Sequence, residues 1–229
     1  MTEPASEAPR VVEAPLVREA ELVLSIERLA VRRGGRTVIE GVDLEARAGE
    51  IVGIVGKNGC GKTTLLSCVA GVLAPREGRV VILGASVWGS RDERQRARRA
   101  LGYVPEAADP PGFLLGNELW SLCAATRGAN PPSQQLRDAL GLDELRDTAL
   151  ERMSLGQRRR ACLGAAFIGP PKLLVLDEPD NGLDARRLDA IVGLIRDHAT
   201  NGGATVLASH DAGLLEQLGA RIYAMPDRV

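Results

Sequence analysis

The chain has 229 residues, which suits one domain with room for a subdomain. Charged residues make up 26%, with 29 Lys and Arg against 30 Asp and Glu, so no net field would draw the protein to nucleic acid or to a membrane surface. Only 3% of residues are aromatic, which disfavours a base-stacking platform and leaves aliphatic side chains to fill the core. We therefore expect an aliphatic α/β protein with no nucleic-acid partner.

The cysteines form no C-x-x-C pair and have no histidine cluster nearby, so they predict neither a zinc site nor a disulfide framework; they are Cys60, Cys68, Cys123 and Cys162. No stretch approaches the roughly 20 consecutive apolar residues that span a bilayer. The N-terminus also lacks the layout of a signal peptide. We expect a chain that is soluble by itself in a reducing cytosol.

The beginning of the chain changes its pattern near Leu22. Residues 1–20 hold prolines among Glu and Ala with no sustained period, which predicts a mobile tail before a domain over residues 21–229. Short apolar runs and intervening turn signals then predict an antiparallel start that leads into one buried strand. These runs are LVLSIERLAV, GVDLEAR and EIVGIVG.

The remaining elements divide into a helical part and an alternating part. We expect a helix over 62–71, a strand over 79–83, a charged helix over 91–100 and a strand at LGYVP. Residues 106–168 contain helical patterns and no convincing strand, which predicts an inserted helical subdomain. From KLLVLD through a helix over 185–198 to RIYAM, strands and helices alternate, which predicts a parallel sheet with right-handed crossovers.

A glycine-rich loop follows the buried strand. Residues 56–63, GKNGCGKT, fit the pattern G-x-x-x-x-G-K-[ST] between an apolar strand and an apolar helix, which is the context that this motif requires. Glycines allow backbone N–H groups to surround phosphate oxygens, and the helix points its positive end at the same charge. Lys62 would reach the β- and γ-phosphates, and Thr63 would offer its hydroxyl oxygen to Mg²⁺. The alternative is an ordinary strand-to-helix turn. The predicted nucleotide contacts are Gly56, Asn58, Gly59, Cys60, Gly61, Lys62, Thr63 and Thr64.

Two further residues are interpreted as structural. Cys60 also fits a reactive thiol, because a helix N-terminus lowers a thiol pKa, but it stands at a variable position whose backbone matters most. His198 lies on a predicted helix among charged neighbours, and we expect it at the surface with no functional role.

The apolar run at 172–176 ends in Asp177 and Glu178, at the end of a buried strand where α/β sheets bind ligands. Asp177 would hold Mg²⁺ through water, and Glu178 would polarise the water that attacks the γ-phosphorus. Either acid alone could instead cap the next helix. With the glycine loop, the pattern predicts an α/β P-loop NTPase with a mainly parallel core sheet, an antiparallel N-terminal part and an inserted helical subdomain.

Residues 153–160, MSLGQRRR, resemble the signature motif of ABC ATPases. They lie between the glycine loop and the acidic strand, in the order of that family. NGLD at 181–184 resembles the D-loop, and Ser209-His210 resembles the switch-histidine motif. The resemblance extends from about Leu22 to Met225 and is to ABC transporter ATP-binding proteins, within the drug and bacteriocin exporter branch.

The resemblance implies a dimer that holds ATP between two subunits. In the family, the signature residues of one subunit face the γ-phosphate held by the other, which makes Ser154, Gly156 and Gln157 contributors across the dimer. His210 would contact the γ-phosphate and help to position Glu178 and water. Because the signature Ser and the helix N–H groups bind anionic oxygen, hydrolysis becomes a switch that opens the dimer.

The chain departs from the family pattern at three positions. Arg33 stands where an aromatic residue usually stacks on adenine; its guanidinium can stack, or it is solvated and the base is weakly held. Glu106 replaces the usual Q-loop glutamine and keeps an oxygen that can approach Mg²⁺. Leu155 replaces a signature glycine, but it leaves Ser154 and Gly156 in place, so we expect catalysis to be intact.

The resemblance implies the ATPase subunit of a transporter, with ATP and Mg²⁺ as its cofactors. We expect a homodimer or heterodimer of ATPase subunits, bound to a separate transmembrane permease at the cytoplasmic face of the cell membrane and working in export. The permease would dock on residues 107–127. The candidate apolar contacts are Phe113, Leu114, Leu115, Leu119 and Trp120, of which core packing explains the last two equally well.

Two other functions are weighed against transport. A soluble ABC ATPase acting on DNA or ribosomes usually carries coiled coils, zinc modules, tandem domains or a basic patch, and the sequence predicts none of these. A regulatory ATPase that binds ATP without turnover is disfavoured by the presence of Glu178 and His210.

Overall fold

The computed structural model describes residues 20–226. The predicted tail, apart from residue 20, lies outside the described residues, so the boundaries of tail and domain stay predictions. In the described range, no helix combines the length and the apolar character that crossing a bilayer requires.

A parallel sheet forms the centre of the structure. Its strand order is β6-β7-β8-β3-β9, and every neighbouring pair is parallel. Successive side chains of a strand point to opposite faces, so Leu173 and Val175 of β7 enter one hydrophobic core while Leu174 and Leu176 enter the other. The strands are β3 (Ile51–Val55), β6 (Leu101–Val104), β7 (Leu173–Asp177), β8 (Ala204–Ala208) and β9 (Arg221–Ala224).

An antiparallel sheet with the order β2-β1-β4-β5 packs beside it. Its strands are β1 (Leu22–Arg33), β2 (Arg36–Arg47), β4 (Glu77–Ile82) and β5 (Ala85–Ser86). Gly34 and Gly35, with φ values of 55° and 79°, close the β1–β2 hairpin in the left-handed conformation that glycine adopts readily. Pairing with β1 extends β2 back to Arg36, ahead of the predicted start at Gly41, because the hairpin register places Arg33 opposite Arg36.

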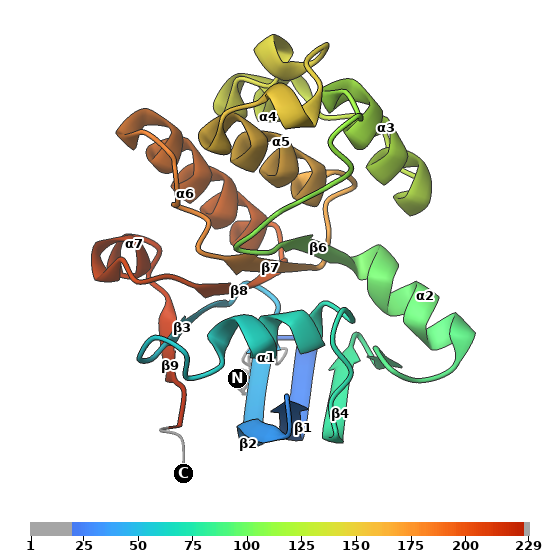
Figure 1. Cartoon of the computed structure of the whole chain (residues 1–229), viewed down its shortest axis with the longest axis vertical. Helices are drawn as coiled ribbons and strands as arrows, with labels where there is room; N and C mark the ends of the chain where they lie inside the picture. Colours follow the sequence, from blue (N-terminus) through green and yellow to red (C-terminus); the bar gives the residue numbers. More distant parts are fainter. Residues whose placement is uncertain (1–19, 227–229) are drawn as a thin grey trace, which may run out of the picture.

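The helices complete a layered α/β fold (Figure 1). Helix α1 lies between the two sheets, whereas α3 to α7 cover the opposite face of the parallel sheet. The predicted fold class is therefore confirmed, including the helical region between β6 and β7. The helices are α1 (Lys62–Val69), α2 (Arg91–Ala100), α3 (Gly116–Arg127), α4 (Gln134–Leu140), α5 (Leu155–Phe167), α6 (Ala185–Thr200) and α7 (Ala212–Gln217), with 3-10 turns at Asp143–Leu145 and Leu150–Arg152.

The apolar residues of α3 and of the segment before it divide between core packing and surface exposure. Leu119 and Trp120 are buried, and the Trp120 indole N–H donates to the carbonyl of Ala161 on α5 at 3.0 Å, so both residues belong to the core. Phe113 remains 75% exposed just before the helix, and Leu122, which the sequence did not single out, is 54% exposed. An apolar surface therefore persists at this end of the helical region.

The prediction that His198 lies at the surface is wrong. The 3.6-residue period of α6 places His198 on the same face as Ile191 and Ile195, and all three are buried. Its Nε2 lies 2.8 Å from the carbonyl oxygen of Pro171, and its Nδ1 lies 3.2 Å from Oγ1 of Thr205. Since a carbonyl can only accept, Nε2 carries the proton and His198 joins α6 to the starts of β7 and β8.

Burial lowers the pKa of His198, although the hydrogen bond to Pro171 opposes the shift. The unfolded chain therefore binds a proton that the folded chain excludes, and stability falls as pH drops below about 6.5, by at most roughly 1.4 kcal/mol per pH unit. Urea unfolding between about pH 7.5 and 5.5 should give a shallower loss for His198→Gln than for the wild type. His210→Gln, which alters an exposed histidine, is the control; equal slopes for wild type and His198→Gln would contradict the prediction.

Candidate active site

The glycine loop joins β3 to α1 and is shaped by close contacts. Gly59 and Gly61 have φ values of 79° and 112°, which L side chains rarely adopt. A Cβ on Gly56 would lie 2.7 Å from Sγ of Cys60, so the loop has no room for a side chain there. The Cys60 side chain is buried beneath the loop, which agrees with its interpretation as a structural position.

Lys62 and His210 meet above this loop. The Lys62 ammonium donates to the carbonyl of Gly56 at 3.0 Å and lies 3.3 Å from Nε2 of His210. The same Nε2 lies 3.3 Å from Oε1 of Glu178. A neutral imidazole nitrogen can accept from Lys62 or donate to Glu178 but cannot do both, so the tautomer of His210 decides which partner it holds.

Glu178 occupies a strained backbone position next to β7. Its φ of 48° is left-handed, a conformation that costs a non-glycine residue roughly 1–3 kcal/mol. The backbone N–H of Glu178 donates to Ala208 at 2.8 Å, and its carboxylate accepts from the backbone N–H of His210 at 3.2 Å. Burial raises the pKa of Glu178, while the contacts with His210 lower it. A buried carboxyl with a raised pKa is suited to proton transfer.

Asp177 has carboxylate oxygens of the kind that bind a cation. Burial raises its pKa, and hydrogen bonds from the Thr63 side chain and the Glu106 backbone oppose this. Its second carboxylate oxygen, Oδ2, is buried without a hydrogen-bond partner, which is costly unless another group satisfies it. Residues 20–226 contain no cluster of three or more His, Cys, Asp or Glu that could hold a metal alone. These oxygens therefore fit a hard cation such as Mg²⁺ that takes its remaining ligands from water and phosphates.

A hollow of about 770 Å³ opens above these groups, within the usual size of a small-molecule site. It brings Arg33, from the β1–β2 hairpin, together with the glycine loop, Glu106, Glu178 and His210. Residues at the start of β2 also line it and were missed by the sequence analysis, although they follow Arg33 closely in the chain. The full lining is Arg33, Arg36, Thr37, Val38, Asn58, Gly59, Gly61, Lys62, Thr63, Thr64, Glu106, Glu178 and His210.

The predicted signature residues lie outside this hollow. Ser154 caps α5: its hydroxyl accepts from the backbone N–H of Gln157 at 3.3 Å, and the Gln157 side chain accepts from the Ser154 N–H at 2.8 Å. A Cβ on Gly156 would collide with the carbonyl of Gly182, so the signature helix packs closely against the D-loop of its own chain. Leu155 is 71% exposed at this helix start. The start of α5 therefore takes no part in the hollow of its own chain.

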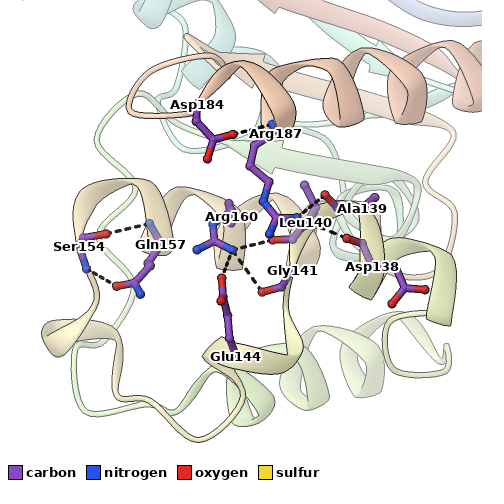
Figure 2. A network of polar contacts seen from close by, with 10 residues as sticks. All are labelled: Asp138, Ala139, Leu140, Gly141, Glu144, Ser154, Gln157, Arg160, Asp184 and Arg187. Atoms are coloured by element: carbon purple, nitrogen blue, oxygen red, sulfur yellow. Dashed lines mark hydrogen bonds and ion pairs between the residues drawn. The ribbon is translucent and has the colours of Figure 1, made fainter.

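Figure 2 shows the polar contacts that join α5 and α6 to the end of α4. From α5, Arg160 donates to the carbonyls of Leu140 and Gly141 at 3.0 and 3.2 Å and pairs with Glu144. From α6, Arg187 donates to the carbonyls of Asp138 and Ala139 at 3.3 and 2.9 Å. Both guanidinium groups bind the negative C-terminal end of α4, an arrangement that the helix dipole favours. Asp184 caps α6 at the backbone N–H of Arg187, so the D-loop and the signature helix share α4 as a support.

Arg159 is a buried residue that the sequence analysis did not single out. Its guanidinium donates to the carbonyls of Pro105 at 2.7 Å and Asp177 at 3.0 Å, and also to that of Glu178. Only 4% of Arg159 is exposed, and burial lowers its pKa. The sequence did offer a signal for this burial: Arg159 precedes Leu163 by four residues, so the two share the apolar face of α5. Arg159 therefore links the signature helix to the backbone of both acidic residues.

These features define a class of protein. A glycine loop between a parallel strand and a helix, a lysine at the helix start and two carboxylates at the end of another parallel strand are the marks of a P-loop nucleoside triphosphatase.

Comparison with known proteins places the chain within that class. A family model described as "ABC transporter" matches residues 39–181. A putative ABC transporter ATP-binding protein of Streptomyces avermitilis is 36% identical over 216 residues; the match covers 93% of this chain and 38% of that protein. The cytochrome c biogenesis ATP-binding export protein CcmA of Bordetella parapertussis is 36% identical over 197 residues, which is 85% of each chain.

Solved structures agree on the fold. A structure described as the ATP-binding subunit of an ABC transporter superposes with a TM-score of 0.82 at 24% identity, covering 89% of this chain and 85% of that chain. The chain belongs to the ABC transporter family, as an ATP-hydrolysing nucleotide-binding domain.

The contacts of Arg159 predict an effect on catalysis. Arg159→Gln should lower kcat for ATP hydrolysis by about 10- to 100-fold with a smaller change in KM, because the Glu178 carbonyl loses a charged donor worth about 1.5–3 kcal/mol. Arg159→Lys should recover part of the loss. Arg158→Gln is the control, since Arg158 contacts the carbonyl of Leu150 and exposed Asp109 instead. Equal kcat values for Arg159→Gln and the control, both folded, would contradict a positioning role.

Proposed function

We propose that this chain is the ATPase subunit of an ABC exporter and that it hydrolyses Mg²⁺–ATP between two subunits to drive a separate membrane protein. The observation that carries the proposal is the meeting of Lys62, Glu178 and His210 beside the unpaired oxygen of Asp177. Export is supported by the name of the Bordetella relative, an ATP-binding export protein.

The nucleotide phosphates would lie along the glycine loop. Backbone N–H groups of the loop and the Lys62 ammonium would bind phosphate oxygens, and Thr63, Asp177 and Glu106 would hold Mg²⁺ directly or through water. Mg²⁺ would neutralise charge that develops on the phosphate oxygens. Arg33 and the start of β2 would receive the base, with the planar guanidinium of Arg33 stacked on adenine.

Glu178 and His210 would carry out the hydrolytic step. The Glu178 carboxylate accepts a hydrogen bond from water and orients it toward the γ-phosphorus. As the water oxygen bonds to phosphorus, the bond to the oxygen of the leaving ADP breaks and the water proton passes to the carboxylate. The raised pKa of Glu178 assists this transfer. His210 would hold the γ-phosphate and keep Glu178 in position.

The signature residues would complete the site of a second subunit. Ser154, Gly156 and Gln157 lie outside the hollow of their own chain, at the exposed N-terminal end of α5. A helix N-terminus offers N–H groups and positive potential to anionic oxygen, so this end suits the γ-phosphate held by a partner. The dimer then closes around ATP and opens after hydrolysis. Both a homodimer and a heterodimer would use the same surface.

The membrane subunit would dock on residues 107–127, at the cytoplasmic face of the membrane. Phe113 and Leu122 are exposed there, and they would supply an apolar contact. A partner bound at this segment would move Glu106 and, through Arg159, the backbone of Glu178.

The dimer is tested by Glu178→Gln, which should slow hydrolysis by at least about 100-fold while ATP binding is retained. Size-exclusion chromatography with Mg²⁺–ATP should then show a stable dimer that dissociates when ATP is removed. Ser154→Ala in the same background should weaken the dimer, since it removes a phosphate contact. Leu122→Ala, on α3, is the folded control. A Glu178→Gln protein that stays monomeric at saturating ATP would contradict the sandwich dimer.

The partner is tested by affinity purification of Glu178→Gln from detergent-solubilised membranes with Mg²⁺–ATP. We expect a polytopic membrane protein to be recovered, and we expect Phe113→Ser together with Leu122→Ser to reduce that recovery by at least about tenfold. Recovery of only ribosomal or DNA-bound partners would contradict the transporter function and support the soluble alternative.

A further inference from the structure

Arginines gather in more than one hollow of the protein. One hollow, of about 650 Å³, lies between α2 and the end of α3, so the prediction that the chain has no basic patch is wrong. It shares Thr126 and Arg127 with the segment 107–127, where we place the membrane subunit, and we assign it no separate ligand. The other is the hollow of the candidate active site, whose arginines come from the β1–β2 hairpin.

The tip of this hairpin presents two arginines to the nucleotide. Arg33 and Arg36 are directly opposite each other in the strand pairing, on either side of the glycine turn. Residues opposite each other in an antiparallel pair carry their side chains on the same face, with Cβ atoms about 4.5–5.5 Å apart. Both arginines line the hollow, which therefore receives two neighbouring guanidinium groups.

The start of β2 also touches the glycine loop. A Cβ on Gly61 would lie 3.3 Å from the carbonyl oxygen of Val38 and 3.1 Å from a side-chain carbon of Ile39, so the two segments pack closely. Arg36 precedes Val38 by two residues, which is about 7 Å along a strand. Phosphates on the glycine loop would thus place the nucleoside beside the start of β2, with its base within reach of Arg36.

The charges of the two arginines have no acidic partner. In the described part of the chain, neither Arg33 nor Arg36 takes part in an ion pair, and both residues are exposed. The carboxylates of the hollow, on Glu106 and Glu178, belong to the group around Asp177. Like charges directly opposite each other destabilise a strand pair, and a ligand rich in acceptors would relieve their repulsion.

A guanidinium distinguishes the two purines by their edges. It carries five N–H donors and no acceptor. Guanine presents two acceptors, O6 and N7, which one arginine binds together, whereas adenine presents N7 beside an amino group that is itself a donor. On the face of the base, by contrast, a guanidinium can stack on either purine. An arginine at the edge of the base therefore selects guanine, and a stacked arginine does not select.

We propose that Arg36 binds the O6 and N7 edge of guanine while Arg33 stacks on the base, so that the site takes GTP at least as well as ATP. Because the two Cβ atoms are about 5 Å apart, a guanidinium stacked on the ring leaves its neighbour beside the ring. Arg33 stacks because it stands at the family's stacking position. The inference rests on the proposed function, since it requires phosphates on the glycine loop.

The test measures the affinity of the full chain for nucleoside diphosphates with Mg²⁺ by isothermal titration calorimetry. Diphosphates lack the γ-phosphate that would be hydrolysed and would close the dimer, so their binding reports on one subunit. GDP and IDP, which both carry O6 and N7, should bind at least as tightly as ADP. The analogue 7-deaza-GDP, which lacks N7, should bind at least about threefold more weakly than GDP.

Three variants separate recognition of the edge from stacking and from overall charge. Arg36→Gln should shift the ratio of the GDP and ADP dissociation constants at least about fivefold in favour of ADP, because glutamine pairs with N6 and N7 of adenine. Arg33→Gln should weaken both nucleotides by a similar factor. Arg79→Gln removes an exposed charge of the same sheet outside the hollow, and it should leave both constants within about twofold of the wild type.

Several outcomes would overturn the guanine site. They are an unchanged GDP to ADP ratio in Arg36→Gln, a shifted ratio in Arg33→Gln instead, or wild-type binding of GDP that is weaker than that of ADP. Equal wild-type binding of GDP and 7-deaza-GDP would also overturn it, and this comparison needs no variant, so it decides even when Arg36→Gln fails to fold.

Hydrolysis separates this proposal from the proposed function. Wild-type kcat/KM for GTP should equal or exceed that for ATP, and Arg36→Gln should reverse the order. Hydrolysis of ATP with poor use of GTP overturns the guanine site alone. Selective binding of GDP through Arg36 without hydrolysis of either triphosphate contradicts the proposed function and leaves the recognition of the base standing. A chain that binds no nucleotide contradicts both.

Discussion

Glu178 is held from three directions, through its backbone and its carboxylate, and the arrangement of the active site depends on this. Its left-handed conformation is unfavourable for a side chain, so the surrounding contacts must maintain it. Ala208 of β8 accepts from its N–H, Arg159 of α5 donates to its carbonyl, and the N–H of His210 donates to its carboxylate. The parallel sheet, the signature helix and the switch histidine therefore all contact one residue, Glu178.

This arrangement gives the helical region a direct physical connection to catalysis. Arg159 also donates to the carbonyl of Pro105, just before the segment 107–127 where we place the membrane subunit. Arg160, from the next position of α5, binds the end of α4, and Arg187 binds the same end from α6. A displacement of α5 would therefore disturb two sets of contacts at once: those to α4, which also supports the D-loop, and those to the backbone of Glu178. Such paired contacts suit a protein that must couple hydrolysis to motion.

The two charged sites use arginine in different ways. Arg159 is buried and satisfied by carbonyl oxygens, so its charge organises the backbone of its own chain. On α2, by contrast, Arg91, Arg98 and Arg99 line an open hollow and form no ion pair among the described residues. A buried guanidinium without ligands would be costly, whereas an exposed group remains solvated and free to bind an anion.

The sequence by itself determined the class of fold and the local motifs. The glycine loop and the pair Asp177 and Glu178 are contiguous in the chain, and their chemistry depends on backbone geometry that a strand-to-helix junction dictates. Alternating and helical periods likewise predicted the two sheets and the helical region, because burial of apolar faces sets both periods. The start of β2 was misjudged, since its extent depends on pairing with β1.

Only the tertiary structure decided which distant groups meet. His198 has charged neighbours in the sequence, yet the packing of α6 on the sheet buries it against Pro171 and Thr205. Arg159 and the arginines of α2 look alike in the sequence, but one becomes buried and the others line an open hollow. The physical reason is that burial and electrostatic partners arise from elements far apart in the chain, which local periodicity does not record.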